Sequence, residues 1–353
     1  MDISDVSSPV FDTLFRLSLT EGFSISDLKR LQEFISSGKR FTGVTVRRGR
    51  DALCSRAYAS LSSEETKRFA DTAREACARF GAAIISFMSE EYPEALKRIP
   101  DAPLVLYRAG APWRDETSVA VVGSRAPTDP GVRFARLLAA DLAAAGCVVV
   151  SGMARGIDAA AHRGALSAGG KTVAVLGCGL DVVYPPEHVR LKDEITEKGT
   201  LFSEYPPGSL PQAHRFPARN RIVSGICRAV VVAEAPERSG ALITARLALE
   251  QGRDVMAVPG SPWFAHTVGS NRLLREGAAP ACSAADVLEI LGVSLPTGPL
   301  SARILDFLDR ERYVEEIASA LLMEMPELLA ALMELELANL VVKRTGGYYK
   351  RRS

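Results

Sequence analysis

The chain has 353 residues, of which 47% are hydrophobic and 24% are charged, so we expect two or three domains with the composition of an ordinary soluble globular protein. Its 43 Lys and Arg residues nearly balance 42 Asp and Glu residues, and the formal net charge is +1. This balance excludes a global positive field that would gather polyanions, so any nucleic-acid site must be a local patch.

Residues 1–80 have the pattern of a helical domain. Serine followed by a carboxylate, which is an N-cap signature, opens two of the expected helices. Six basic residues lie between Lys39 and Arg56. We interpret them as a solvated face, with an auxiliary DNA contact as the alternative. The acidic N-terminus lacks a signal-peptide pattern and no apolar run approaches the ~18 residues of a membrane span, so we expect a cytoplasmic protein without membrane segments.

Residues 81–291 alternate between short apolar runs and helical patterns. The runs are AAIISFM, LVLYRAG, SVAVVGS, CVVVSG, KTVAVLG, TLFSEY, RAVVVAEA and DVMAVPG. Near-continuous apolar strands separated by helices indicate a parallel sheet covered on both faces, so the expected fold class is α/β.

Two neighbouring strands of this sheet end in small-residue turns that each contain an arginine. The residues concerned are Gly123, Ser124 and Arg125 in the first turn and Ser151, Gly152 and Arg155 in the second. Turns at the carboxyl ends of parallel strands are where α/β sheets bind ligands. Backbone N–H groups and guanidinium groups at such turns suit phosphate, so these turns predict an anion site on one rim of the sheet.

A third polar segment begins a later helix. Its candidate residues are Phe216, Arg219, Asn220 and Arg221. Arginines and an amide can hold a phosphodiester while an aromatic ring stacks on a base. The alternative is that Arg219 and Arg221 form salt bridges with Glu204 or Glu234. The turn with Ser239 and Gly240 opens the next helix and offers further N–H donors to an anion.

Two glycine-containing segments imitate nucleotide-binding motifs. Residues 165–172, ALSAGGKT, nearly spell the phosphate-binding loop of NTPases. That loop must follow a strand and open a helix, whereas here a helix is expected to end near Gly169 and a strand to follow. The second segment, from Gly177 to Gly179, is a lone G-x-G, which we interpret as a tight turn at a strand end.

The C-terminal part begins after a break, residues 292–299, that we interpret as a linker. Residues 300–353 predict three helices and a β-hairpin that turns at Gly346 and Gly347, the outline of a winged helix-turn-helix. The expected recognition helix carries Glu324, Glu327, Glu334 and Glu336, which would oppose phosphates. The expected wing carries Lys343, Arg344, Lys350, Arg351 and Arg352. We therefore favour a protein-contact or modulatory role for this module.

The chain shows no pattern of a metal or cofactor site. Its six cysteines are spread singly without a C-x-x-C pair and are interpreted as reduced, mostly buried thiols. Its four histidines stand far apart without a partner at ligand spacing. No nucleophile with an adjacent base is apparent, and we expect a ligand-holding surface rather than an enzyme.

These motifs together resemble the DNA-processing protein A (DprA/Smf) family. The segments that carry the resemblance, within residues 86–290, include VVGSRAPTDPG, VVSGMARGIDAAAH, FSEYPPG, FPARNRIVSG and GSNRLLREGA. The resemblance implies an extended Rossmann-like core over residues 81–291 and a C-terminal winged-helix domain over residues 300–353. It also implies a sterile-alpha-motif or helix-hairpin-helix-like domain over residues 1–80, although the segment after Glu21 lacks the usual Gly-Pro pair.

The same resemblance implies a function in natural transformation. Members bind single-stranded DNA without sequence preference, dimerise, and help to load the RecA recombinase. Carried over by motif, Gly123, Ser124, Arg125, Ser151 and Gly152 would line the phosphate pocket. Phe216, Arg219, Asn220 and Arg221 would lie beside them.

Two other classes of function compete with this interpretation. A phosphoribohydrolase-like enzyme on a related fold would cleave nucleotides, but no acidic residue follows the Ser239 turn before Glu250. A winged-helix transcription factor would prefer duplex DNA and leave a sequence footprint.

Overall fold

The computed structural model describes residues 9–19, 27, 57, 59–293, 303–305, 307–308, 310–337, 341–344 and 346–351. The chain divides into two compact units, Met1–Gly292 and Val293–Ser353, which are described separately below. Within the described residues, no helix is both long and apolar enough to cross a membrane.

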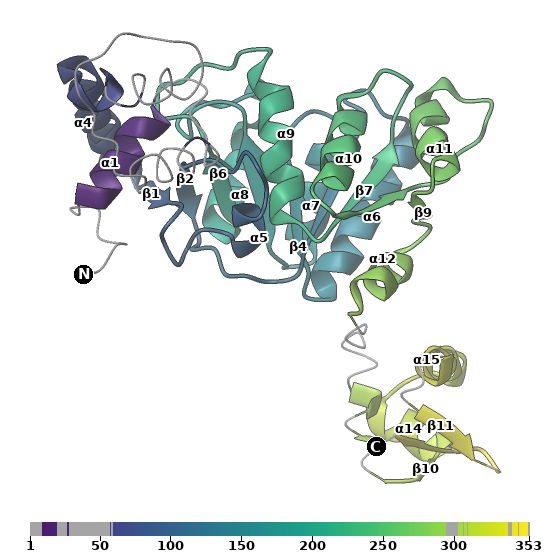
Figure 1. The fold of residues 1–353 in the computed structure, drawn as a ribbon. Helices are drawn as coiled ribbons and strands as arrows, with labels where there is room; N and C mark the ends of the chain where they lie inside the picture. The colour runs from purple at the N-terminus through teal and green to yellow at the C-terminus, as the bar shows by residue number, and fades with distance from the viewer. Residues whose placement is uncertain are drawn as a thin grey trace, which may run out of the picture. The chain divides into compact units, whose positions relative to one another are not determined.

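The larger unit is built on a nine-stranded sheet in the order β1-β2-β6-β5-β4-β3-β7-β8-β9 (Figure 1). The strands are β1 Ala83–Ser86, β2 Val105–Gly110, β3 Ser118–Gly123, β4 Val148–Ser151, β5 Thr172–Leu176, β6 Thr200–Ser203, β7 Ala229–Glu234, β8 Asp254–Ala257 and β9 Ala279–Pro280. From β6 to β9 all neighbours are parallel, whereas β1 pairs with β2, and β2 with β6, in antiparallel register. The expected parallel sheet is thus confirmed, with β2 and β1 added at one edge through antiparallel pairing.

The strand order creates one topological switch point beside β3. The chain moves outward from β3 through β4 and β5 to β6, and then returns across the sheet to β7 on the other side of β3. In such sheets a crevice opens at the carboxyl ends of the strands where the direction of winding reverses. The fold therefore places a ligand-sized opening at the ends of β3, β4 and β7.

Helices cover both faces of the sheet. The helices are α5 Glu94–Lys97, α6 Asp129–Ala144, α7 Ile157–Ser167, α8 Val189–Lys198, α9 Arg215–Ile226, α10 Gly240–Glu250, α11 Val268–Arg275 and α12 Ala284–Leu291, with short 3₁₀ turns Pro186–His188 and Ala265–Thr267. Helices α6, α7 and α8 pack on one face, and α9, α10 and α11 on the other (Figure 1). Because both faces are covered, the central strands β3, β4, β5 and β7 are buried almost throughout, which explains their continuous apolar runs.

The NTPase-like segment has the predicted order of elements. Helix α7 ends at Ser167, Gly169 follows with a left-handed φ of 68°, and β5 begins at Thr172. Since the helix precedes the strand, the helix does not present its N-terminus to a ligand at this loop.

The described N-terminal helices, α1 Pro9–Ser18 and α4 Glu64–Phe80, pack against β1 and β2. The Phe15 ring meets Tyr107 of β2 edge-on at 6.3 Å, and Arg74 of α4 pairs with Asp12 of α1. The side chains of these two helices are part of the hydrophobic core of the larger unit. A separate domain over residues 1–80 stays a prediction. The basic run between Lys39 and Arg56 lies outside the described residues.

The smaller unit has a winged-helix outline. Its described elements are β10 Arg312–Tyr313, α14 Val314–Leu321, α15 Met325–Leu337, β11 Val341–Arg344 and β12 Tyr348–Arg351, with strand order β10-β12-β11. A core of its own, which includes Ile304, Leu328 and Leu332, holds these elements together. Glu327, Glu334 and Glu336 are exposed on α15, as the sequence predicts. Arg352 lies outside the described residues.

Candidate functional site

A cavity of about 670 Å³ opens at the switch point of the sheet. Nine of the predicted site residues line it: Gly123, Ser124, Arg125, Gly152, Phe216, Arg219, Asn220, Ser239 and Gly240. The first residues of α7, α9 and α10 contribute to the wall, so the positive ends of these helix dipoles adjoin the cavity. The two arginine turns and the helix start therefore do meet at one rim, although they are up to about a third of the chain apart in sequence.

Arg125 is an exposed cation at this cavity. Its guanidinium carbon lies 5.5 Å from the centre of the Phe216 ring, a cation–π geometry. Phe216 also packs against Tyr184, with ring centres 5.1 Å apart. Within the described residues Arg125 takes part in no ion pair. Its charge is therefore available to an anion, and Phe216 holds the guanidinium in place.

Arg219 lines the cavity but is buried, with 3% of its surface exposed. Its Nη1 donates to the backbone carbonyl of Gly152 at 2.7 Å and also to the carbonyl of Val175. A Cβ atom on residue 152 would lie 2.4 Å from a guanidinium nitrogen, so the glycine is required for this close approach. Arg219 thus ties the ends of β4 and β5 together and adds a positive charge behind the cavity wall.

Asp158 is the acidic counterpart of Arg219. Its carboxylate accepts hydrogen bonds from the backbone N–H groups of Gly152 at 3.1 Å and Ala154 at 3.3 Å. Burial raises the pKa of Asp158, while Arg219 and the two N–H groups oppose that rise. Asp158 is the one acidic residue among the described residues that line the cavity. It fixes the turn after β4 at the site.

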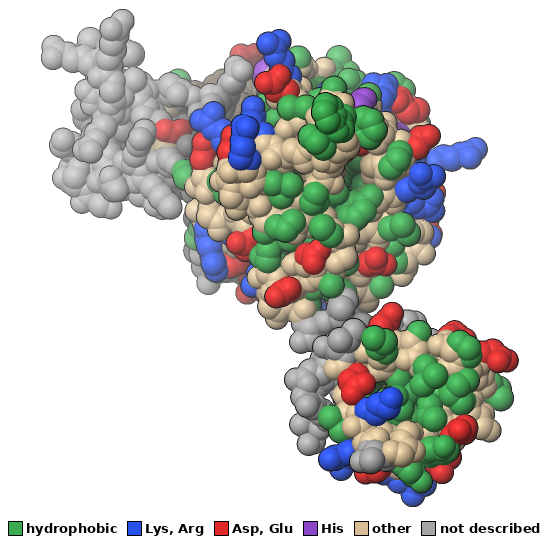
Figure 2. Space-filling view, turned by 90° about the vertical axis from the view of Figure 1, so that its right-hand side faces the viewer, with side chains coloured by type: hydrophobic (Ala, Val, Ile, Leu, Met, Phe, Trp, Pro, Cys, Tyr) green, Lys and Arg blue, Asp and Glu red, His purple; other side chains and the backbone are tan. Residues whose placement is uncertain are grey.

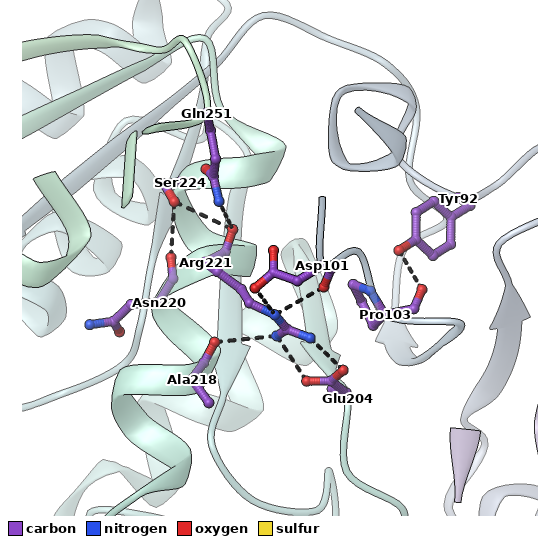
Figure 3. Close-up of polar contacts among 9 residues, drawn as sticks. All are labelled: Tyr92, Asp101, Pro103, Glu204, Ala218, Asn220, Arg221, Ser224 and Gln251. Carbon is purple, nitrogen blue, oxygen red and sulfur yellow. Dashed lines mark hydrogen bonds and ion pairs between the residues drawn. The ribbon is translucent and has the colours of Figure 1, made fainter. Parts of the chain in front are cut away.

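Arg221 is absent from the cavity lining and is engaged in other contacts, which Figure 3 shows. It forms a two-pronged ion pair with Glu204, at 2.6 and 2.9 Å, and a further ion pair with Asp101 at 3.1 Å. Burial by itself lowers the pKa of Arg221, but the Glu204 carboxylate, together with Asp101, raises it overall. The salt-bridge alternative with Glu204 is therefore the arrangement observed, and Arg221, which was expected to bind DNA beside the phosphate pocket, instead forms ion pairs away from the cavity lining.

Ser151 and Arg155 also stand outside the cavity lining. Ser151 is buried, and its hydroxyl donates to the carbonyl of Val121 at 2.7 Å, because the residue still belongs to β4. Arg155 lines a small adjoining hollow and pairs with Glu187, whose carboxylate raises the pKa of this exposed guanidinium. Neither residue is free to bind an anion in this arrangement.

Among the lining residues that the sequence prediction did not include, three have a charged or aromatic side chain: Arg238, Tyr184 and Asp158. Arg238 directly precedes the Ser239–Gly240 turn and is exposed, and no ion pair involves it within the described part of the chain. Its position beside a helix start could have identified it from sequence. Tyr184 and Asp158 carry no comparable local pattern, because only the folded chain brings them to the cavity.

Glu234 anchors the first turn. Its carboxylate accepts from the backbone N–H of Thr128 at 3.0 Å and from the Thr128 hydroxyl at 2.6 Å, while its carbonyl accepts from the N–H of Ser124 at 2.7 Å. Gly156 supports the same turn from the other side with a φ of 75°, which favours glycine. The loop that carries Arg125 is thus held at both ends.

A buried histidine lies beneath the site. His162 has no exposed surface, and its Nδ1 lies 2.7 Å from the hydroxyl of Thr172. Burial, aided by the nearby His188 and Arg219, lowers the pKa of His162 to about 3. Its imidazole therefore stays neutral at physiological pH and serves the packing of α7 against β5.

Sequence comparison places most of the chain within known profiles. The profile described as DNA recombination-mediator protein A matches residues 83–292, and that of the DprA winged helix domain matches residues 283–347. Protein Smf of Escherichia coli (strain K12) is 38% identical over 287 residues, which cover 75% of this chain and 76% of that protein. DNA processing protein DprA of Streptococcus pneumoniae (strain ATCC BAA-255 / R6) is 47% identical over 204 residues, which cover 58% and 72%. The match to Protein Smf of Synechocystis spans 52% of that relative's length.

Comparison of folds also finds proteins named DNA processing protein A. The X-ray structure of DNA processing protein A from Streptococcus pneumoniae superposes with a TM-score of 0.65 at 35% identity, covering 79% of this chain and 96% of that one. DNA processing protein A from Helicobacter pylori, whose structure is described for its unique single-stranded DNA binding mode, has a TM-score of 0.54 at 29% identity and covers 60% and 95%.

Proposed function

The chain belongs to the DNA recombination-mediator protein A family, and from this membership and the geometry of the cavity we propose that it binds single-stranded DNA without sequence preference. The observation that carries the proposal is the convergence of Arg125 and Arg238 with three helix N-termini on a cavity that holds one acid. The carboxylate of that acid, Asp158, already accepts hydrogen bonds from two backbone N–H groups. The cavity is therefore a local positive site on a chain without net positive charge.

The chemistry of the site suits a phosphodiester backbone. Guanidinium groups and helix N-termini bind phosphate oxygens regardless of base identity, because every nucleotide presents the same phosphate. A single strand can bend into a cavity of this size and expose its phosphates to these groups. Because these contacts are made to phosphates and not to base edges, binding should not depend on the DNA sequence.

Among the described residues, each copy of the chain has two cations at the cavity that form no ion pair, Arg125 and Arg238, which is enough for a short stretch of DNA. Tight binding then requires several copies of the chain on one strand. A homodimer supplies the first increase in overall affinity, because its two sites bind the same strand. On the basis of family resemblance, we further propose that the bound strand is handed to RecA during natural transformation. The family's description as a recombination mediator supports this step.

The winged-helix unit serves a protein contact rather than DNA reading. Three carboxylates, Glu327, Glu334 and Glu336, are exposed on α15, the position of a recognition helix. Carboxylates at that position repel the phosphates that a recognition helix must approach. The cations of β11 and β12, including Lys343 and Arg351, could touch a strand only from the wing.

The test is a competition experiment on the full chain. Labelled oligothymidylate bound to the protein is challenged with unlabelled single strands of several sequences and with duplexes of the same sequences. We expect all single strands to compete about equally and the duplexes to compete weakly. Equal competition by duplex, or a preference for one sequence, would refute the proposal and favour a transcription factor. RecA filament assembly on the strand, with and without the protein, tests the second step.

A further inference from the structure

The loop between β8 and α11, residues 258–267, displays two aromatic rings to solvent. Trp263 is 89% exposed and Phe264 is 61% exposed, and Val268 at the start of α11 is 41% exposed beside them in sequence. Figure 2 looks onto the side of the larger unit that carries α11 and shows hydrophobic side chains gathered on this face. A group of large apolar side chains exposed close together is a candidate interaction surface.

The loop is held in a defined shape. Asn271 bridges across it, since its Oδ1 accepts from the N–H of Gly260 at 3.0 Å and its Nδ2 donates to the carbonyl of Gly260 at 2.9 Å. The hydroxyl of Thr267 donates to the carbonyl of Ser261 at 2.7 Å. These bonds fix both ends of the aromatic segment, so Trp263 is presented to solvent by a braced loop.

The same loop is joined to the wall of the cavity. The N–H of Gly269 donates to the carbonyl of Ala235 at 2.8 Å, and Ala235 directly precedes Pro236, which lines the cavity. His266 lies 3.8 Å from Glu234, the residue that anchors the Arg125 turn. The aromatic loop and the cavity therefore adjoin each other at the end of β7.

The charge of this segment favours a polyanion. No acidic residue occurs between Asp254 and Glu276, whereas two arginines lie within that interval: Arg272, which pairs with Glu276 at 3.5 Å, and Arg275. Inside the cavity, by contrast, the Phe216 ring already contacts Arg125 and Tyr184. The site thus has its phosphate-binding groups in the cavity and its freely exposed aromatic rings on the adjoining loop.

We propose that Trp263, with Phe264 beside it, is a base-stacking platform for the DNA strand as it leaves the cavity. This inference rests on the proposed single-strand binding. Stacking on an aromatic face tolerates any base, which agrees with binding that does not depend on sequence. Only a strand long enough to extend past the cavity rim reaches the platform, so the contribution of Trp263 must depend on strand length.

The test uses the fact that the chain has two tryptophans. Trp113 is 7% exposed, whereas Trp263 is 89% exposed, so a change of fluorescence on DNA binding reports on Trp263. The full chain is titrated with labelled oligothymidylates of about 4 to about 16 nucleotides while anisotropy and tryptophan emission are recorded together. We expect emission to be quenched only above a threshold length, and W263A to lower affinity about 5-fold to about 150-fold above that threshold alone.

Matched variants separate the possible outcomes. L137A removes another exposed side chain, on α6 at the opposite face of the sheet, and should leave binding and quenching unchanged. Binding without quenching at every length, or equal affinities for W263A and the wild type, would overturn the platform. Emission that shifts with protein concentration without DNA would also overturn it and assign the rings to a second copy of the chain. If the wild type binds no oligothymidylate at all, it is the proposed function that fails.

Discussion

Arg125 and Arg221 look alike in the sequence, but replacing each should have opposite consequences. Arg125 is exposed at the cavity and unpaired within the described residues, so R125A removes a cation available to phosphate. A hydrogen bond to a charged group contributes about 1.5–3 kcal/mol, and we expect affinity for oligothymidylate to fall about 10-fold to 100-fold. One phosphate contact fewer also reduces the slope of log K against log salt by about 0.7. The free energy of unfolding should change by less than about 0.5 kcal/mol.

R221Q should instead destabilise the larger unit. The Arg221 side chain is 13% exposed and holds Glu204, which is 26% exposed, together with Asp101 (Figure 3). Removal of one partner of a buried ion pair lowers the free energy of unfolding by about 3–5 kcal/mol. We expect about 3 kcal/mol here, because water partly screens Glu204. For a unit of this size, that loss lowers Tm by roughly 6 °C. DNA affinity measured well below Tm should stay close to that of the wild type.

The variants R125A and R221Q are compared with the wild type by thermal unfolding and by anisotropy titrations with oligothymidylate at several salt concentrations. Arg228 precedes β7 at the amino end of the strand, away from the cavity, and is exposed, so R228A serves as the matched loss of one positive charge. The reasoning is refuted if R125A binds with the affinity and salt slope of R228A. It is equally refuted if R221Q loses DNA binding while its Tm is unchanged.

Two further predictions concern the support of the site. F216L removes the ring over which the Arg125 guanidinium lies and should weaken DNA binding about 2-fold to 30-fold, measured by anisotropy. F216Y keeps a ring and should bind like the wild type. Equal affinities of F216L and F216Y would contradict the role of the Phe216 ring in holding Arg125. His162 has a pKa of about 3 in the folded chain against about 6.5 when unfolded, so the unfolded chain takes up the proton first as pH falls and stability is lost. The free energy of unfolding by urea should decrease by about 2 kcal/mol more between pH 7 and pH 5 in the wild type than in H162Q, and identical decreases would refute the assignment.

Local patterns in the sequence were sufficient to predict the core of the fold. The apolar runs that became β3, β4, β5 and β7 are continuous because these strands are buried on both faces, and that requirement is visible in the residues themselves. The turns at Gly123 and Gly152 were predicted to share a rim because parallel strands end on one side of a sheet. The winged-helix outline was likewise predicted from three helical patterns and a Gly-Gly hairpin turn.

What the sequence could not decide is which arginine is free to bind. Arg219 and Arg221 lie two positions apart on one helix and fit the same motif, yet one is fixed by the carbonyl of Gly152 and the other by Glu204. Gly152 is 67 residues from Arg219 in sequence, and Glu204 is 17 residues from Arg221 and follows another strand, β6, so both pairings depend on how folding arranges the strand ends. The sequence by itself determined where the cations and turns stand along the chain. Only the tertiary structure decided which charges are neutralised inside the protein and which face solvent, because an ion pair forms between groups that folding brings within a few ångströms.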